Sequence, residues 1–558
     1  MIVFYCFILY AGTKSQTIIK NKVKTMKKII IVLSFFSLTL FANNNTASTH
    51  LDIINGFDTF GNAIKNIAIN YIEDVSINKL IDKGIEGMLT DLDPYAEYFT
   101  TTNNNEMVII SSGRYFGFGL TYNIIHNKIV VSNVRDNSPA KEVNIRIGDI
   151  IVSVDSVLLD SVNVDSTFST IDKQEVLFKI VRVGLDDTLN IKLAKNIVEV
   201  NSVTYSDILD INFTDSVSLP SNIGYIKLEQ FTANSYTEFL KAFYELQKRC
   251  ILEGLIIDLR DNGGGVLDDA LKICNMFIPR GSTILTTNGR NSDREYKAVL
   301  NPIDTILPLV VLIDSRSASA SEVVSGCLQD LDRATIVGNT SFGKGLVQEV
   351  FPLTHSHFLK ITTAKYYTPS GRCIQKIDHY HNNTTISIDS AKVFYTKKGK
   401  KVYELNGITP DIISGIDTIN SRLARILIDN YILYNFMTYY LNVVSDGNYN
   451  IDTIYNHFIN YATDYNNAIY IKTISLLDNI KKIDTNSITA KIIDNTIDSM
   501  VLGYKQLLLE DSNTQFAIKK YLEYDYMSRT LSYTNFIKYA ILEDKSLKVA
   551  LKTFLKEK

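Results

Sequence analysis

The stretch that decides the fold runs over residues 310–326 and reads V-V-L-I-D-S-R-S-A-S-A-S-E-V-V-S-G. Its apolar, β-branched start, residues 309–313, predicts a buried strand. Small polar residues follow, and a helical pattern begins at Glu322. A strand that turns sharply into a helix exposes a small side chain at the turn and leaves the first helical amides unpaired. A serine at this junction is therefore a candidate nucleophile beside an anion-stabilising backbone.

A glycine-flanked loop at residues 338–345 follows a second short strand and carries Lys344. A lysine with the ordinary pKa of about 10.4 is protonated at pH 7 and cannot act as a base. Burial lowers the pKa of a lysine because it disfavours the ammonium form. We expect apolar surroundings from Phe342, Leu346 and Val347, and no acidic residue lies within four positions of the lysine. A neutral Lys344 would take the proton of a serine and return it to a leaving amine.

Length and composition bound the class of protein. The chain has 558 residues, enough for about three or four domains of roughly 100–200 residues each. The net charge of −3 argues against a nucleic-acid partner. The five cysteines have neither metal-ligand nor C-x-x-C spacing, so we expect no metal ion and no cofactor, and they do not fix the compartment.

The N-terminus resembles an export signal. Lys27 and Lys28 precede an apolar run at residues 29–42, and polar asparagines follow. A basic start, a short apolar centre and a small residue at its end are typical of a secretory signal. The run is shorter than the roughly 20 residues that a membrane span needs. We therefore expect export to the periplasm or cell envelope, with an uncleaved, membrane-associated segment as the alternative. Met26 is a candidate start.

A second group of motifs lies in the β-rich stretch after residue 103. It begins with the loop Gly117, Phe118, Gly119 and Leu120. Such a loop presents backbone amides to a carboxylate, and the strand edge behind it can pair with an extended peptide. Together with S-P-A at 138–140 and I-G-D-I-I at 147–151, the stretch resembles a PDZ domain. The resemblance implies capture of a protein or peptide by its C-terminus.

Three serines, Ser317, Ser319 and Ser321, are candidate nucleophiles at the strand–helix junction. The run S-A-S-A-S-E, followed by F-G-K-G at 342–345, resembles the carboxyl-terminal processing (tail-specific) serine proteases, which use a serine–lysine dyad. In that family the nucleophile precedes the lysine by 25 positions, which selects Ser319 for Lys344. The resemblance also implies that Gln348, one helical turn beyond the lysine, orients it by hydrogen bonding.

The same resemblance implies an oxyanion hole. The family's D-L-R-N-N-P-G-G stretch appears here as D-L-R-D-N-G-G-G at 258–265. The donors would be the backbone amides of Ala320 and of Gly264 or its neighbour Gly265. Gly263 replaces the family's proline, which leaves the choice between the two glycines open. The resemblance spans roughly residues 51–415, including Y-Y-T-P-S-G-R-C-I-Q at 366–375 and G-I-T-P-D at 407–411.

The expected fold class is a multidomain α+β protein. The expected domains are a signal or extension at 1–42, an N-terminal helical domain at 43–102, a PDZ domain at 103–200, an α/β serine protease core at 201–420, and a helical C-terminal tail at 421–558. Within the tail, apolar periodicity predicts helices at 426–441, 468–481, 490–509 and 515–539. No chemical motif occurs in that tail.

Three rival interpretations of the motifs compete with this one. The spacing from Gly338 to Lys344 imitates a phosphate-binding P-loop, but Gly345 stands where a Ser or Thr would hold magnesium. His355 and His357 would be the candidate bases of a Ser-His triad. Residues 263–265 alone would be only a flexible turn.

The sequence therefore predicts a secreted serine endopeptidase that cleaves C-terminal or unfolded segments of proteins captured by its PDZ domain. The alternative is a non-catalytic PDZ scaffold that retains the protease frame. The resemblance also implies that the PDZ domain gates the active site, with residues 200–221 as a hinge. Homo-oligomerisation or an adaptor is left open.

Overall fold

The computed structural model describes residues 44–100, 105–171, 173–209, 222–290, 293–354, 356–378, 384–385, 392–404, 406–415, 421–463, 476–477, 479–480 and 487–555. The expected export signal and most of the helix expected at 468–481 lie outside the described residues. The chain divides into two compact units, Met1–Asp91 and Leu92–Lys558.

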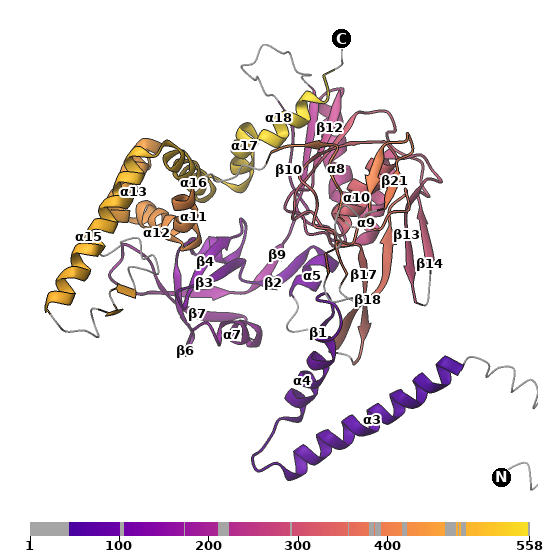
Figure 1. Cartoon of the computed structure of the whole chain (residues 1–558), viewed down its shortest axis with the longest axis horizontal. Coiled ribbons are helices and arrows are strands. Elements are labelled where there is room, and N and C mark those ends of the chain that lie inside the picture. The colour runs from indigo at the N-terminus through magenta and orange to yellow at the C-terminus, as the bar shows by residue number, and fades with distance from the viewer. Residues whose placement is uncertain are drawn as a thin grey trace, which may run out of the picture. The chain divides into compact units, whose positions relative to one another are not determined.

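The described part of the first unit is a pair of helices, α3 (Asn44–Asn70) and α4 (Ile77–Leu89), as the sequence predicts (Figure 1). Ser76 caps α4 by accepting a hydrogen bond from the Lys79 amide. The ring of Phe60 lies against Gly84, where a Cβ atom would come within 2.5 Å of it. Among the described residues, no helix has both the length and the apolar character that crossing a membrane requires.

The second unit begins with a β-domain whose main sheet has the strand order β3-β4-β5-β7-β8, with β6 paired to β5. Its strands are β2 (Arg114–Gly117), β3 (Leu120–Ile125), β4 (Lys128–Val134), β5 (Ile150–Val154), β6 (Val157–Leu158), β7 (Glu175–Val181), β8 (Leu189–Ala194) and β9 (Asn196–Glu199). Strand β2 pairs with β9. Two short helices, α6 (Pro139–Glu142) and α7 (Val164–Thr170), complete it, and α5 (Asn105–Ser112) precedes it.

A six-stranded sheet forms the centre of the α/β region, in the order β10-β11-β12-β15-β16-β23. Its strands are β10 (Val203–Leu209), β11 (Ile223–Leu228), β12 (Gly254–Asp258), β15 (Leu309–Ile313), β16 (Thr335–Gly338) and β23 (Ile412–Ile413). From β11 onward the pairing is parallel. Every residue of β12 and β15 is buried, because helices cover both faces of the sheet.

One face of this sheet packs against α8 (Ser235–Arg249), α9 (Leu267–Phe277) and α10 (Ala320–Asp330). The other face packs against the tail helices α17 (Tyr533–Glu543) and α18 (Lys545–Lys552) (Figure 1). There Leu547 and Leu551 share one apolar cluster with Ile256 and Val310. The C-terminal tail therefore completes the core of the α/β region.

A second sheet runs in the order β1-β18-β13-β14, with β17 also paired to β18. Its strands are β1 (Glu97–Thr100), β13 (Thr283–Gly289), β14 (Asp293–Lys297), β17 (Leu346–Pro352) and β18 (His357–Tyr367). Short two-stranded ladders join β19 (Ile377–Asp378) to β20 (Thr384–Thr385) and β21 (Val393–Tyr395) to β22 (Lys401–Tyr403). Strand β1 therefore belongs to the same sheet as β17, the strand that begins two residues after Lys344.

Two pairs of tail helices that apolar periodicity predicted as single helices are separate. The helix expected at 426–441 is α11 (Arg422–Asp429) and α12 (Ile432–Tyr439), and the helix expected at 515–539 is α16 (Ser512–Thr530) and α17. Tyr431 breaks the first with a left-handed φ of 59°, and Ser532 caps a new helix in the second. Helices α13 (Ile451–Thr463) and α18 were not predicted, whereas α15 (Ser487–Glu510) matches the helix expected at 490–509.

The proposed hinge at 200–221 was partly wrong. Residues 203–209 form β10, which pairs with β11 in the central sheet. Residues 210–221 lie outside the described part of the chain.

The tail also contacts the β-domain. A π-helical turn, Tyr440–Val444, continues α12, and the Tyr434 hydroxyl of α12 donates to the Val131 carbonyl oxygen of the β-domain (2.9 Å).

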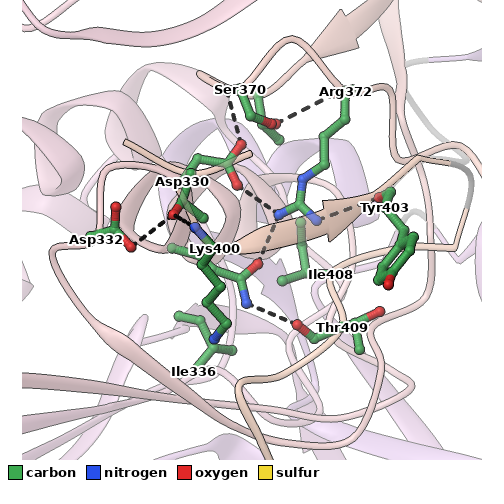
Figure 2. A network of polar contacts seen from close by, with 12 residues as sticks. Asp330, Asp332, Ile336, Ser370, Arg372, Lys400, Tyr403, Ile408 and Thr409 are labelled. Carbon is green, nitrogen blue, oxygen red and sulfur yellow. Dashed lines mark hydrogen bonds and ion pairs between the residues drawn. The ribbon is translucent and has the colours of Figure 1, made fainter. Parts of the chain in front are cut away.

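A buried ion pair fixes the C-terminal end of α10. Figure 2 shows the Arg372 guanidinium between Asp330 and the Tyr403 carbonyl oxygen. One of its nitrogens donates both to Asp330 Oδ1 and to Gln329 Oε1, each at 2.8 Å, and Asp330 Oδ2 accepts from the Ser370 amide (3.0 Å). The two charged side chains are 1% and 0% exposed. The pair therefore holds residues 366–375 against the end of this helix.

Replacing Asp330 by Asn should lower the free energy of unfolding by about 3–5 kcal/mol, because it leaves the Arg372 charge buried and uncompensated. Urea unfolding at pH 7 measures the change. Glu245→Gln, which removes an exposed ion pair with Lys248, serves as the control and should leave the midpoint unchanged. Equal midpoints for Asp330→Asn and wild type would contradict the structural role of the pair.

Candidate active site

The strand–helix junction places Ser319 directly before α10, after the buried strand β15. Its backbone has φ 53° and ψ −113°, a region that non-glycine residues rarely adopt. Such a conformation persists only where the surroundings hold it, and it is common at functional sites. Ser319 is half-buried and lines a cavity of about 550 Å³.

The three candidate serines have different surroundings. The Ser317 hydroxyl donates to the Leu259 carbonyl oxygen (2.8 Å), and the Ser321 hydroxyl donates to the Asn262 carbonyl oxygen (2.9 Å). Both of these side chains are fully buried, whereas Ser319 faces the cavity. The structure thus gives Ser317 and Ser321 a packing role that the sequence alone could not separate from a chemical one.

Lys344 lines the same cavity as Ser319, and its Nζ atom lies 4.4 Å from the centre of the Tyr95 ring. The expected surroundings were partly wrong. Leu346 is buried, as expected. Phe342 is 46% exposed, so it does not provide the expected apolar burial. Gln348 also lines the cavity, but it lies on strand β17 and not one helical turn beyond the lysine. Its side-chain amide donates to Thr362 Oγ1 (3.1 Å).

Glu322 joins the two segments that carry the serine and the lysine. Its Oε2 atom accepts hydrogen bonds from the main-chain amides of Ser319 (2.8 Å) and Lys344 (2.9 Å). Its Oε1 atom accepts from the Gly343 amide (2.7 Å) and the Ser341 hydroxyl (2.5 Å). No acidic residue is close to Lys344 in the sequence, but the fold brings the Glu322 carboxyl to its main-chain amide.

The Glu322 carboxyl is fully buried, and this burial raises its pKa to about 7. The four hydrogen bonds that it accepts act in the opposite direction, because they favour the carboxylate. All four donors point at the carboxylate oxygens, so these bonds offset part of the cost of burying the ionised form. An acidic group poised near neutral pH thus lies between the candidate nucleophile and the candidate base.

The glycine stretch opposite Ser319 is held in place and is not a simple flexible turn. Gly264 has φ 98°, and a Cβ atom there would lie 2.8 Å from the Ser319 Cβ and 2.9 Å from the Ala320 nitrogen. The Gly264 amide donates to Asn262 Oδ1 (2.9 Å), which is itself buried. Because that amide already has an acceptor, Gly265 is the better candidate for the second oxyanion donor beside Ala320, the first residue of α10.

The P-loop interpretation does not fit the structure, and of the two histidines proposed for a Ser-His triad, His357 does not line the cavity. The loop that carries Lys344 leads into strand β17, whereas a P-loop leads into a helix N-terminus. His357 lies on β18, where its ring stacks on Tyr98 at 5.9 Å, away from the cavity lining. His355 lies outside the described residues.

The predicted peptide-binding loop, Gly117 to Leu120, leads into β3, an edge strand that pairs with β4 among the described residues. Gly119 has φ 78°, and a Cβ atom there would lie 2.2 Å from the Ser138 Cβ. A larger residue would therefore displace Ser138, which caps α6. Phe118 is buried and packs edge-to-face on Phe178 (5.2 Å).

Comparison with known proteins identifies both regions. Residues 115–193 match the PDZ domain, and residues 222–382 match Peptidase family S41. The chain is thus a serine-type peptidase that carries a PDZ domain.

Sequence identity with individual proteins places the chain in a narrower family of peptidases. A carboxy-terminal-processing protease of Bartonella bacilliformis is 33% identical over 362 residues, which are 63% of this chain and 80% of that protein. A carboxyl-terminal-processing protease of Synechocystis is 30% identical over 52% of this chain and 68% of its own length. A chloroplastic C-terminal processing peptidase of Tetradesmus obliquus is 31% identical over 51% and 63%. The chain belongs to the carboxy-terminal processing protease family.

Sequence reasoning missed two residues of this site, Glu322 and Tyr95. Glu322 had a readable signal, since S-x-x-E at residues 319–322 is the capping-box pattern that joins an N-cap to its third helical residue. Its hydrogen bonds to the Gly343 and Lys344 amides leave no signal in the sequence. Tyr95 lies outside all the motifs that the sequence analysis identified.

Replacing Glu322 by Gln should change how stability depends on pH. Because the folded pKa, about 7, lies above the ordinary value of 4.5, this group contributes stability that is full below pH 4.5 and is lost as pH rises through 7. The unfolding free energy of Glu322→Gln minus that of wild type should therefore rise by about 3 kcal/mol between pH 4.5 and 8. Denaturant unfolding across this range measures it, and a constant difference would contradict the assignment.

Replacing Gly264 by Ala should lower kcat on a peptide substrate by roughly 100-fold or more, because the new methyl group would push on Ser319 and Ala320. Gly281→Ala is the matched control. Gly281 has a similar φ of 87° with no atom within 4 Å of the added Cβ, so it carries the backbone strain without the contact. Similar kcat values for the two variants would show that the approach to Ser319 is unimportant.

Proposed function

We propose that this chain is an exported serine endopeptidase in which Ser319 is the nucleophile and Lys344 is the general base. One observation supports this assignment most strongly. Ser319 and Lys344 line one cavity, and a single oxygen of Glu322 accepts hydrogen bonds from the main-chain amides of both. A nucleophile and a base must be held in fixed geometry for proton transfer to be efficient.

The reaction begins when Ser319 Oγ attacks the scissile carbonyl carbon while its proton moves to a neutral Lys344 Nζ. The carbonyl electrons move to the oxygen, which the amides of Ala320 and Gly265 stabilise, each by roughly 2.7–4 kcal/mol. Collapse of this intermediate breaks the C–N bond as Lys344 returns the proton to the leaving amine. Water then attacks the acyl-enzyme with Lys344 again as the base, and Ser319 is regenerated.

Gln348 has a supporting role in this proposal. It faces the same cavity from β17, two residues beyond the strand's first position, and its hydrogen bond to Thr362 ties it to the neighbouring strand. An amide fixed in this way can orient the lysine amine without adding a charge that would favour the ammonium form.

The substrate is an unfolded or C-terminal protein segment. The loop from Gly117 to Leu120 would bind the terminal carboxylate, and the edge of β3 that is unpaired among the described residues would pair with the peptide main chain. The names of the relatives, carboxy-terminal processing proteases, agree with this substrate class. Export rests on the sequence pattern of residues 27–42, which predicts a periplasmic or cell-envelope location.

Replacing Ser319 or Lys344 by Ala should abolish cleavage of an unstructured reporter protein while the far-ultraviolet circular dichroism spectrum stays unchanged, because each variant removes one reacting group. Mass spectrometry of the released peptides measures cleavage. Ser499→Ala and Lys248→Ala change an exposed serine and an exposed lysine and should retain full activity. Full cleavage by Ser319→Ala would refute the nucleophile, and a wild-type protein without any cleavage would favour the scaffold alternative.

A further inference from the structure

The Tyr95 ring lies against the amine that the proposed mechanism uses as its base. The Lys344 Nζ atom is 4.4 Å from the ring centre, well within the roughly 6 Å over which a ring attracts a cation. The two residues are far apart in the chain, and neither the family motifs at 317–345 nor the glycine stretch includes the tyrosine. A residue from the segment before β1 thus lies against the side chain of a residue that lines the cavity.

The position of Tyr95 is fixed by its own segment. The Tyr95 amide donates to Oδ1 of the buried Asp93 (2.9 Å), which forms a tight turn around Pro94. Strand β1 follows at once and pairs with β18, and the Phe99 ring stacks on Phe358 at 5.6 Å. These contacts anchor the turn to the sheet that also contains β17, the strand after the lysine.

A further link ties Tyr95 to the lysine loop. The Tyr95 side chain hydrogen-bonds with Gln375, and Gln375 Oε1 accepts from the amide of Gly345, the residue after the lysine (2.7 Å). The tyrosine therefore contacts the amine of Lys344 directly. Through the Gln375 side chain, it is also linked to the main chain of the next residue, Gly345.

Other charged or titratable groups lie around the cavity that Lys344 lines. The Glu322 carboxyl binds the Lys344 amide from α10, and the Tyr366 hydroxyl of β18 lies 3.4 Å from the Ser319 carbonyl oxygen. Asp261, Glu229 and Lys360 line the same cavity. The Tyr95 ring covers the amine. The negative face of an aromatic ring favours the ammonium form over the neutral amine.

We propose that Tyr95 is a positioning residue for Lys344: its ring fixes the amine at the cavity and stabilises the ammonium form, and so sets the pH at which the base becomes available. This inference rests on the Ser319–Lys344 mechanism proposed above. It assigns the turn before β1 a role in positioning the base.

The test is the pH dependence of kcat/KM for the full-length protein on a peptide substrate, since its acidic limb reports the base of the free enzyme. Tyr95→Leu keeps an apolar cover but removes the ring, so the midpoint of the acidic limb should move to lower pH by roughly 0.4–1.5 units. Tyr95→Phe keeps the ring and should stay within about 0.3 units of wild type. Tyr98→Leu, three residues on, is the matched control and should leave the midpoint unchanged.

Each outcome decides the matter. A Tyr95→Leu midpoint that is unchanged or higher, or a loss of activity by the same factor at every pH, would overturn the proposal, because a purely structural residue would behave in that way. Lys344→Ala separates this failure from failure of the mechanism. If Lys344→Ala is inactive and the Tyr95→Leu limb does not move, only the role of Tyr95 falls; if Lys344→Ala cleaves normally, the base itself is wrong.

Discussion

The buried carboxylate of Glu322 is the interaction on which the site depends. It reaches back to the Ser319 amide from the first turn of α10 and across to the Gly343 and Lys344 amides. Two segments that meet only in the folded protein are thereby held at one distance from each other. Burial of the charged carboxylate is costly and raises its pKa to about 7, and the four hydrogen bonds offset part of that cost.

The opposite end of α10 is fixed as firmly. Asp330 and Arg372 form an ion pair that is almost fully buried, and this pair holds the segment that leads to Gln375 and hence to the lysine loop. The helix that presents Ser319 is thus anchored at both ends by buried charge. It packs on one face of the central sheet, while α17 and α18 of the tail cover the other. The tail therefore stabilises the sheet on which α10 packs, although it carries no chemical motif.

Local pattern predicted the parts of the fold that local physics decides. The strand at 309–313 and the helix that follows were confirmed, because β-branched residues and a change of period are contained in a few neighbouring positions. The fold class and the PDZ domain were confirmed as well. The helices expected at 426–441 and 515–539 were joined wrongly, since apolar periodicity continues across Tyr431 and Ser532 while the backbone does not.

Non-local contacts were beyond that reasoning. The resemblance to a family, and not spacing alone, selected Ser319 over Ser317 and Ser321, and burial now gives the physical reason. Neither the strand pairing that brings β1 to β18 nor the ring of Tyr95 at Lys344 leaves a periodic signal. Gln348 lines the cavity, but it lies on a strand and not one helical turn beyond the lysine.

The most direct test of the account is to find where the acyl group of a slowly hydrolysed peptide ester becomes attached. Acid quenching during turnover, digestion and mass spectrometry would locate the adduct. The account predicts an acyl group on Ser319, at the tip of the strand–helix junction, and none in Ser319→Ala. An adduct on Ser317 or Ser321, or turnover that continues in Ser319→Ala, would contradict it.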